Sequence, residues 1–316
     1  MTAGFPTAEH IRAAHERIKP FINHTPVITS ATFNRMFRSC IFFKCENFQK
    51  VGAFKARGAT NAVRSLGHDS LTKGVATHSS GNHAQALSWA AALAGANAYI
   101  VMPSNSSPVK VDAVKGYGGR ITLCEPTLSS RETTLHKIIE ETGAIEIHPY
   151  NDPRIIAGQA TSALELIEEI SGLDIIIAPV GGGGLLSGTA LSALFFAPGT
   201  KVVAAEPEQA NDAFRSFTAG TLIPSVNPQT IADGLRTSLG SLTFPIIQKH
   251  VSQIVTVSED SIVRAMKLLW ERMKIIVEPS SAVPFAAIME NKINIEGKRV
   301  GLILSGGNVD LNNLPW

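Results

Sequence analysis

The sequence predicts an α/β fold in which a parallel sheet is covered by helices on both faces. Short apolar runs, as long as typical strands, alternate along the chain with longer amphipathic segments typical of helices. This order repeats over most of the 316 residues, and repeated strand-helix units form parallel sheets joined by helical crossovers. Ligands of such folds bind at the carboxyl ends of the strands. We therefore expect the functional site in the loops that follow the strands.

Each predicted element rests on a run of this kind. The predicted strands are residues 41–43, 74–77, 98–102, 120–124, 174–180, 202–205 and 300–304. The predicted helices are residues 56–66, 82–94, 107–117, 129–142, 156–170, 185–195 and 259–273. Residues 74–146 hold a compact series of strand-helix pairs. This section predicts a small lobe inserted into a larger one.

Composition excludes several classes of protein. Hydrophobic residues make up 44% of the chain and charged residues 17%, as in globular proteins. Lys and Arg number 28 against 26 Asp and Glu, without a basic run, so nothing favours a nucleic-acid partner. No apolar run approaches the roughly 20 residues of a membrane span, and residues 1–15 lack a signal-peptide core. Three cysteines without metal-ligand spacing indicate a reducing compartment, so we expect a cytoplasmic protein.

A run of glycines is the strongest sign of a bound anion. Gly181, Gly182, Gly183 and Gly184 follow an apolar strand and precede a predicted helix. Glycines let backbone N–H groups approach a ligand, and a helix N-terminus adds partial positive charge. The spacing matches neither a dinucleotide fingerprint nor a P-loop. The run predicts a phosphate site; the alternative is a flexible turn.

One lysine lies where a loop meets a predicted helix. Lys55 follows Phe54 directly, and the helix is expected over residues 56–66. A free lysine, with a pKa of about 10.4, is a poor nucleophile because it is protonated. Burial beside an aromatic ring would lower that pKa and free the amine. The same pattern is common in solvated surface lysines, and it does not distinguish Lys55 from Lys44 or Lys50.

A family resemblance is carried by this lysine segment and three loops. Residues 44–59, KCENFQKVGAFKARGA, resemble the lysine motif of the serine/threonine dehydratase and serine racemase family. Residues 79–84, 181–185 and 305–308 match its other motifs in the same order, and the similarity runs from about residue 11 to residue 310. The family is a group of pyridoxal-phosphate enzymes of the tryptophan-synthase-β fold type. It implies two doubly wound parallel-sheet lobes with the cofactor in the cleft between them.

The resemblance implies the residues that hold pyridoxal phosphate. Lys55 would form the covalent link with the cofactor aldehyde. Backbone N–H groups of residues 181–185 would bind the phosphate, including that of Leu185. The remaining cofactor contacts are assigned to Phe54 beside the ring, Asn82 at the ring hydroxyl, Asn151, and Ser305 at the pyridine nitrogen. A hydroxyl at that nitrogen leaves it largely unprotonated, which suits elimination and racemisation.

The resemblance also implies how substrate is bound. Its carboxylate would be held at a helix N-terminus by Ser79, Ser80, Gly81, Asn82 and His83. In serine racemases the serine at position 80 is the acid–base group opposite the lysine. Inversion at Cα requires two proton carriers, whereas a dehydratase needs one. Related dehydratases carry this serine too, and its alternative role is helix N-capping.

A metal site is implied by a third match. The resemblance assigns a divalent cation to Glu206, the backbone carbonyl of Ala210, and Asp212. Hard oxygen ligands suit Mg²⁺, with Ca²⁺ or Mn²⁺ as alternatives. Without the resemblance, this segment would be read as an ordinary acidic loop.

Some family members bind ATP between subunits. Matching positions in this chain are Ser30, Lys50, Gln85 and Tyr117. Ala31 and Val51 replace the hydroxyl residues of some members, so activation by ATP stays open. The family also implies a homodimer.

The function implied is a serine racemase that also eliminates water from serine, giving pyruvate and ammonia. The alternatives are a threonine or 3-hydroxyaspartate dehydratase with little racemisation, an aspartate racemase, or a non-catalytic binding protein. We expect residues 1–70 and 149–316 to form the large cofactor-binding lobe. Residues 71–148 would form a small mobile lobe that carries the substrate loop.

Overall fold

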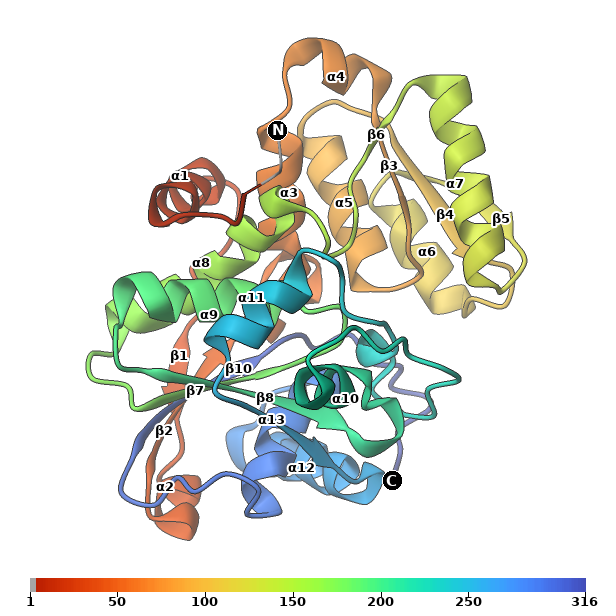
Figure 1. The fold of residues 1–316 in the computed structure, drawn as a ribbon. Coiled ribbons are helices and arrows are strands. Elements are labelled where there is room, and N and C mark those ends of the chain that lie inside the picture. The colour runs from red at the N-terminus through yellow and green to blue at the C-terminus, as the bar shows by residue number, and fades with distance from the viewer. Residues whose placement is uncertain (1–3) are drawn as a thin grey trace.

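Two parallel sheets organise the protein, each in its own lobe (Figure 1). The computed structural model describes residues 4–316. The large-lobe sheet has six strands, in the order β1 (Val27–Thr29), β2 (Cys40–Cys45), β10 (Arg299–Leu304), β7 (Ile175–Pro179), β8 (Lys201–Pro207) and β9 (Gln253–Val257). The small-lobe sheet has four, in the order β5 (Gly119–Cys124), β4 (Ala98–Pro103), β3 (Val75–His78) and β6 (Ile145–Glu146). Only β1 is antiparallel to its neighbour, so the predicted α/β fold is confirmed.

Helices connect and cover these strands. In and around the large lobe they are α1 (Ala8–Ile18), α2 (Ala31–Phe37), α3 (Lys55–Arg64), α8 (Pro153–Glu169), α9 (Gly184–Phe196), α10 (Asp212–Ala219), α11 (Thr243–His250), α12 (Glu259–Met273) and α13 (Pro279–Met289). The small sheet carries α4 (His68–Lys73), α5 (Asn82–Leu93), α6 (Pro108–Gly116) and α7 (Leu128–Thr142). Short 3-10 turns are η1 (Glu46–Phe48), η2 (Lys50–Gly52), η3 (Glu208–Ala210) and η4 (Asp233–Leu235). No helix within residues 4–316 combines the length and hydrophobicity that crossing a membrane requires.

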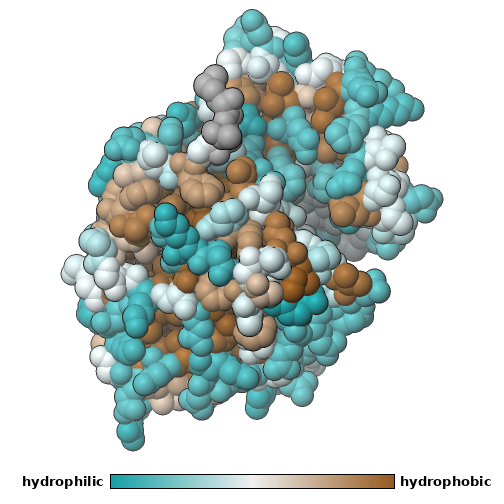
Figure 2. Space-filling view, in the orientation of Figure 1, coloured by the Kyte–Doolittle hydropathy of each residue, from teal (hydrophilic) through white to brown (hydrophobic). Residues whose placement is uncertain are grey.

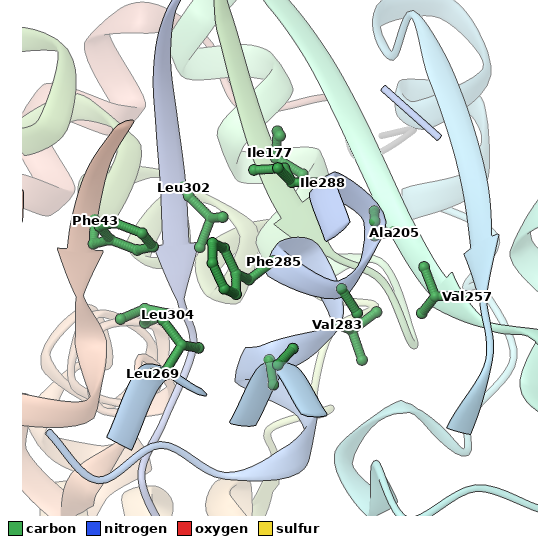
Figure 3. Close-up of a cluster of buried hydrophobic side chains, with 14 of the residues drawn as sticks. Phe43, Ile177, Ala205, Val257, Leu269, Val283, Phe285, Ile288, Leu302 and Leu304 are labelled. Carbon is green, nitrogen blue, oxygen red and sulfur yellow. The ribbon is translucent and has the colours of Figure 1, made fainter. Parts of the chain in front are cut away.

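The large sheet is buried on both faces, which explains its continuous apolar strands. Successive side chains of a strand point to opposite faces. Ile177 and Leu302 therefore pack with Phe285 of α13 on one face (Figure 3). Ile176 and Ile303, which are adjacent to Ile177 and Leu302 in their strands, pack toward α8 and α9 on the other face. The strand ends are thus held rigidly, and the loops that follow them start from fixed positions.

A buried ionic cluster positions the helix that begins at Lys55. Arg57, with no exposed surface, donates to Glu46 at 2.7 Å and to Glu165 of α8 at 2.7 Å. Lys44 of β2 donates to the same Glu165 at 2.6 Å. Two cations and two anions balance, as burial of charge demands. The cluster ties α3 to β2 and α8, and so fixes where α3 starts.

One hydrophobic cluster continues from the small sheet into α3. It joins Val75 and Ile100 of the small sheet with Leu87 of α5 and Ala59 of α3. Helix α3 therefore packs against the small lobe although it is tied by charge to the large one. The lobe boundaries at residues 70/71 and 148/149 stay a prediction.

Candidate active site

The predicted loops lie at the carboxyl ends of β3, β7 and β10. The loop after β10 is joined to the segment before Lys55 by backbone contacts: Phe54 donates its N–H to the Ser305 carbonyl at 3.0 Å, and Gly307 donates its N–H to the Gly52 carbonyl at 2.9 Å. An isolated bridge between Ala53 and Gly306 completes this contact. The segment before Lys55 is thereby docked on the end of β10.

Lys55 is a half-buried amine at the start of α3. Its Nζ donates to the carbonyl of Pro149 at 2.8 Å and lies 5.2 Å from the centre of the Phe54 ring. Burial lowers the pKa of Lys55 to about 8, while the charge of Glu278 acts in the opposite direction. A lowered pKa enlarges the neutral fraction of the amine near pH 7, which favours nucleophilic and proton-transfer chemistry.

The two competing lysines are in different surroundings. Lys44 is fully buried, and its Nζ donates hydrogen bonds to the Glu165 carboxylate and, at 2.7 Å, to the Thr25 carbonyl. Lys50 is exposed on η2. Of the three, Lys55 alone combines burial with freedom from a paired carboxylate, which favours it as the reactive lysine.

The glycine run forms the turn into α9. Gly183 has a φ of +88°, a conformation that favours glycine. A Cβ on Gly182 would lie 2.2 Å from the Tyr150 ring, and one on Gly181 would lie 2.9 Å from Leu235 Cα. Thr243 donates its hydroxyl to the Gly182 carbonyl at 2.8 Å. The run is therefore a packed turn at a helix N-terminus, not a flexible one, and it can accept a phosphate group.

Asn82, the first residue of α5, bridges the two lobes. Its Nδ2 donates to Glu278 Oε1 at 3.1 Å and Oε2 at 3.0 Å, and its Oδ1 accepts from Asn308 Nδ2 at 2.9 Å. Glu278 precedes α13 and Asn308 follows β10. Glu278 was not among the predicted site residues, because no motif marks a single acidic residue before a helix.

Ser305 also has a partner that the sequence did not reveal. Its Oγ lies 3.1 Å from Ser281 Oγ and is 2% exposed. Ser281 has one proton, and its closest acceptor is the Gly306 carbonyl at 2.6 Å. The Ser305 and Ser281 hydroxyls are within hydrogen-bond distance and either can donate, so Ser281 is placed to orient the Ser305 hydroxyl.

The loop between β3 and α5 presents its small residues at a helix N-terminus. Gly81 is the N-cap of α5 and donates to Ser79 Oγ at 3.4 Å. The alternative role of Ser80 as N-cap is therefore wrong, since that position belongs to Gly81. His83 is buried, and its Nε2 contacts the Ile147 carbonyl at 3.0 Å. Burial holds the pKa of His83 well below its usual value, so this ring is neutral.

The segment containing Asn151 packs beside the glycine turn. Asn151 Nδ2 donates to Ser241 Oγ at 3.1 Å, and its Oδ1 accepts from Leu242 N–H at 2.8 Å. Both ends of its amide thus bind another loop, and its contact with the cofactor stays a prediction. Tyr150, which sequence reasoning overlooked, instead packs its ring on Gly182 and edge-on to His148 at 4.6 Å.

The predicted metal ligands lie together at the end of β8. Glu206 accepts hydrogen bonds from the N–H groups of Ala213 at 3.0 Å and Phe214 at 2.9 Å. Asp212 is fully buried, and within residues 4–316 neither of its carboxylate oxygens has a hydrogen-bond partner. Burial raises the pKa of Glu206 to about 9 and that of Asp212 to about 6. A cation bound here would satisfy the unpartnered oxygens and stabilise both carboxylates.

The four predicted nucleotide residues have diverse structural roles. Ser30 caps α2 by accepting from Phe33 N–H at 3.4 Å. Lys50 is exposed on η2, which packs against the helix α5 that contains the buried Gln85. Tyr117 ends α6 and packs on the small-lobe core. ATP binding stays a prediction.

Comparison with known proteins agrees with this architecture. The model of the pyridoxal-phosphate dependent enzyme family matches residues 18–306. A β-hydroxyaspartate dehydratase of Paracoccus denitrificans is 56% identical over 98% of this chain and 99% of its own length. A serine racemase of Dictyostelium discoideum is 50% identical over 98% of this chain and 96% of its own. The solved maize serine racemase has a TM-score of 0.96 at 44% identity, covering 98% of this chain and 95% of that one. The predicted resemblance is thus confirmed, and the chain belongs to the family of pyridoxal-phosphate dependent enzymes.

Proposed function

We propose that this enzyme interconverts L- and D-serine and also eliminates water from serine, giving pyruvate and ammonia. The observation that carries the proposal is the half-buried Lys55 amine beside the docked β10 loop, in an enzyme whose other sheet supplies the Ser79–Ser80 segment. Because the two segments belong to different sheets, Lys55 and Ser80 can approach a bound substrate from different sides. The similarity to serine racemases at about half of all positions supports the same substrate.

Different residues of the chain have separate roles in binding and in proton transfer. Pyridoxal phosphate, when bound, supplies the electron sink that stabilises negative charge at the substrate Cα. The N-terminus of α5 holds the substrate carboxylate through backbone N–H groups. Lys55 Nζ holds or removes the Cα proton on one face, and Ser80 Oγ does so on the other. The hydroxyl of Ser305 would face the ring nitrogen of the cofactor, and residues 181–185 would bind its phosphate.

A second candidate is the dehydration of 3-hydroxyaspartate. It is favoured by the 56% identity to a β-hydroxyaspartate dehydratase. It is also favoured by Arg131 on α7, whose charge lowers the pKa of His78 further after burial has lowered it. A guanidinium near the substrate loop could pair with a side-chain carboxylate. The same cation would serve aspartate racemisation.

A substrate screen separates these activities. The purified enzyme, saturated with pyridoxal phosphate, is incubated with each enantiomer of serine, threonine and aspartate and with 3-hydroxyaspartate. Chiral chromatography follows racemisation, and a keto-acid assay follows elimination. We expect D-serine and pyruvate from L-serine. Oxaloacetate from 3-hydroxyaspartate, without racemisation of serine, would replace the proposal by the second candidate.

We also propose Mg²⁺, or Ca²⁺ or Mn²⁺, at Glu206, the Ala210 carbonyl and Asp212. The support is the pair of buried carboxyl groups, one of them without hydrogen-bond partners among the described residues. Mg²⁺ at about 100 times its Kd should stabilise the fold by about 2.7 kcal/mol and raise the Tm by several degrees. Asp212→Asn should remove this shift, whereas Asp260→Asn on the exposed side of α12 should keep it. An equal shift in both variants, measured by differential scanning fluorimetry, would exclude this site.

A homodimer is proposed as well. Apolar side chains gather on the large lobe around α9 and α11 in Figure 2, where Leu194 and Phe195 of α9 are exposed. Exposed apolar surface of this kind favours contact with another subunit.

We further propose that residues 71–148 move as one body that carries the substrate loop. Asn82 and Lys110, which bonds to Asp233, would be among their polar links to the large lobe.

A further inference from the structure

Glu278 is a buried carboxyl group in the middle of the site. Its side chain is 4% exposed, and both oxygens accept from Asn82 Nδ2 across the lobe boundary. It also lies against the β10 loop, since a Cβ on Gly306 would be 2.9 Å from Glu278 Oε1. Asn308 completes the arrangement by donating to Asn82 Oδ1. Asn82 is therefore held at both ends of its amide by the large lobe.

The charges around Glu278 leave it without a bonded cation. The charged groups that face it are Lys55 on α3, Asp233 on η4 and Lys110 on α6. Lys110 and Asp233 are paired with each other and largely cancel. Lys55 donates to Pro149, so its charge acts on Glu278 only through space. Among the described residues, the one side chain that hydrogen-bonds to Glu278 is the neutral Asn82.

Burial raises the pKa of Glu278 to about 7. The carboxyl is therefore a mixture of charged and neutral forms near pH 7, even with the Lys55 amine close by. A bound cofactor would bring the negative charge of its phosphate to the cleft. Nearby negative charge favours the neutral carboxyl.

We infer that Glu278 is a positioning residue: it holds Asn82 in the cleft and takes up one proton from solvent when the cofactor engages Lys55. The step forms one O–H bond on the carboxyl and transfers no electrons. It keeps the interior from gaining an unpaired negative charge beside the cofactor. The inference rests on the cofactor site of the proposed function and is independent of which amino acid is the substrate.

Calorimetric titration of the cofactor-free full chain with pyridoxal phosphate tests the proton uptake. Titrations in two buffers of different ionisation enthalpy give the number of protons exchanged at each pH. The difference between the wild type and Glu278→Gln reports the proton of Glu278 together with any change in the Lys55 proton, because the Glu278 charge raises the pKa of Lys55. We expect the variant to lose up to about one proton of uptake, with the largest loss near and just above pH 7, between the free and bound pKa values. Glu271→Gln, an exposed site on α12, should match the wild type.

The outcomes are distinct. Equal proton counts for the wild type and Glu278→Gln at every pH would overturn the uptake. A wild type that binds no pyridoxal phosphate would instead refute the cofactor site itself.

Glu278→Asp tests the positioning role of Glu278. It also provides a test if Glu278→Gln does not fold. Its carboxyl keeps the proton but is one methylene too short to reach Asn82. We expect the proton count to survive while kcat/KM falls roughly tenfold, the effect of losing one hydrogen bond. Kinetics equal to the wild type would show that Asn82 does not depend on Glu278.

Discussion

Replacing Lys55 with alanine is expected to abolish both racemisation and elimination. The substitution removes the amine that would bind the cofactor and carry the Cα proton, while Ala56 and Arg57 keep α3 in place. We expect kcat/KM to fall by roughly 10⁴-fold or more, because a nucleophile and an acid–base group are lost together. The visible absorption band of the lysine-bound cofactor should disappear as well.

Spectra and kinetics of Lys55→Ala should be compared with those of Lys267→Ala, which changes an exposed lysine of α12. This control should keep the band and the activity. Circular dichroism verifies that both variants are folded. A Lys55→Ala enzyme that keeps the absorption band would assign the cofactor to another lysine.

Replacing Ser80 with alanine should separate the two reactions. Racemisation needs a proton carrier on each face of Cα, so we expect it to fall by about 10²- to 10⁴-fold. Elimination from one serine enantiomer should survive, because Lys55 can still remove the proton on its own face. The Lys55 band should be unchanged.

Chiral chromatography and a keto-acid assay on the same samples give both rates. Exchange of the Cα proton in deuterated water, followed by NMR, adds a direct test: the variant should exchange with retention of configuration. Ser129→Ala, at an exposed position in α7, serves as the matched control. Racemisation that persists in both directions in Ser80→Ala would contradict the two-carrier mechanism.

Local sequence was sufficient to predict most of the strands of the fold. Strands β7 and β10 are continuous apolar runs because both faces of each are buried, so they were recognisable without their neighbours. Three strands were not predicted: β1, β6 and the five-residue β9. Strands β1 and β6 have three and two residues, too few to display a period. The strand conformation of all three depends on pairing, with β2, β3 and β8 respectively.

The features of the site likewise differ in whether local sequence could predict them. The sequence by itself predicted a phosphate site at the glycine turn, since four successive glycines permit a close approach of the backbone to a ligand. The family resemblance then pointed to Lys55, but residue patterns alone could not separate it from Lys44 or Lys50.

Only the tertiary structure decided the surroundings of each ionisable group. Lys44 is paired with Glu165, 121 residues away, while Lys55 meets a carbonyl 94 residues away. Glu278 accepts a hydrogen bond from Asn82, which is 196 residues away in the sequence. That contact alone identifies Glu278 as a residue of the site. The reason is physical: a pKa is set by burial and by the charges that folding brings near, and neither is a property of local sequence.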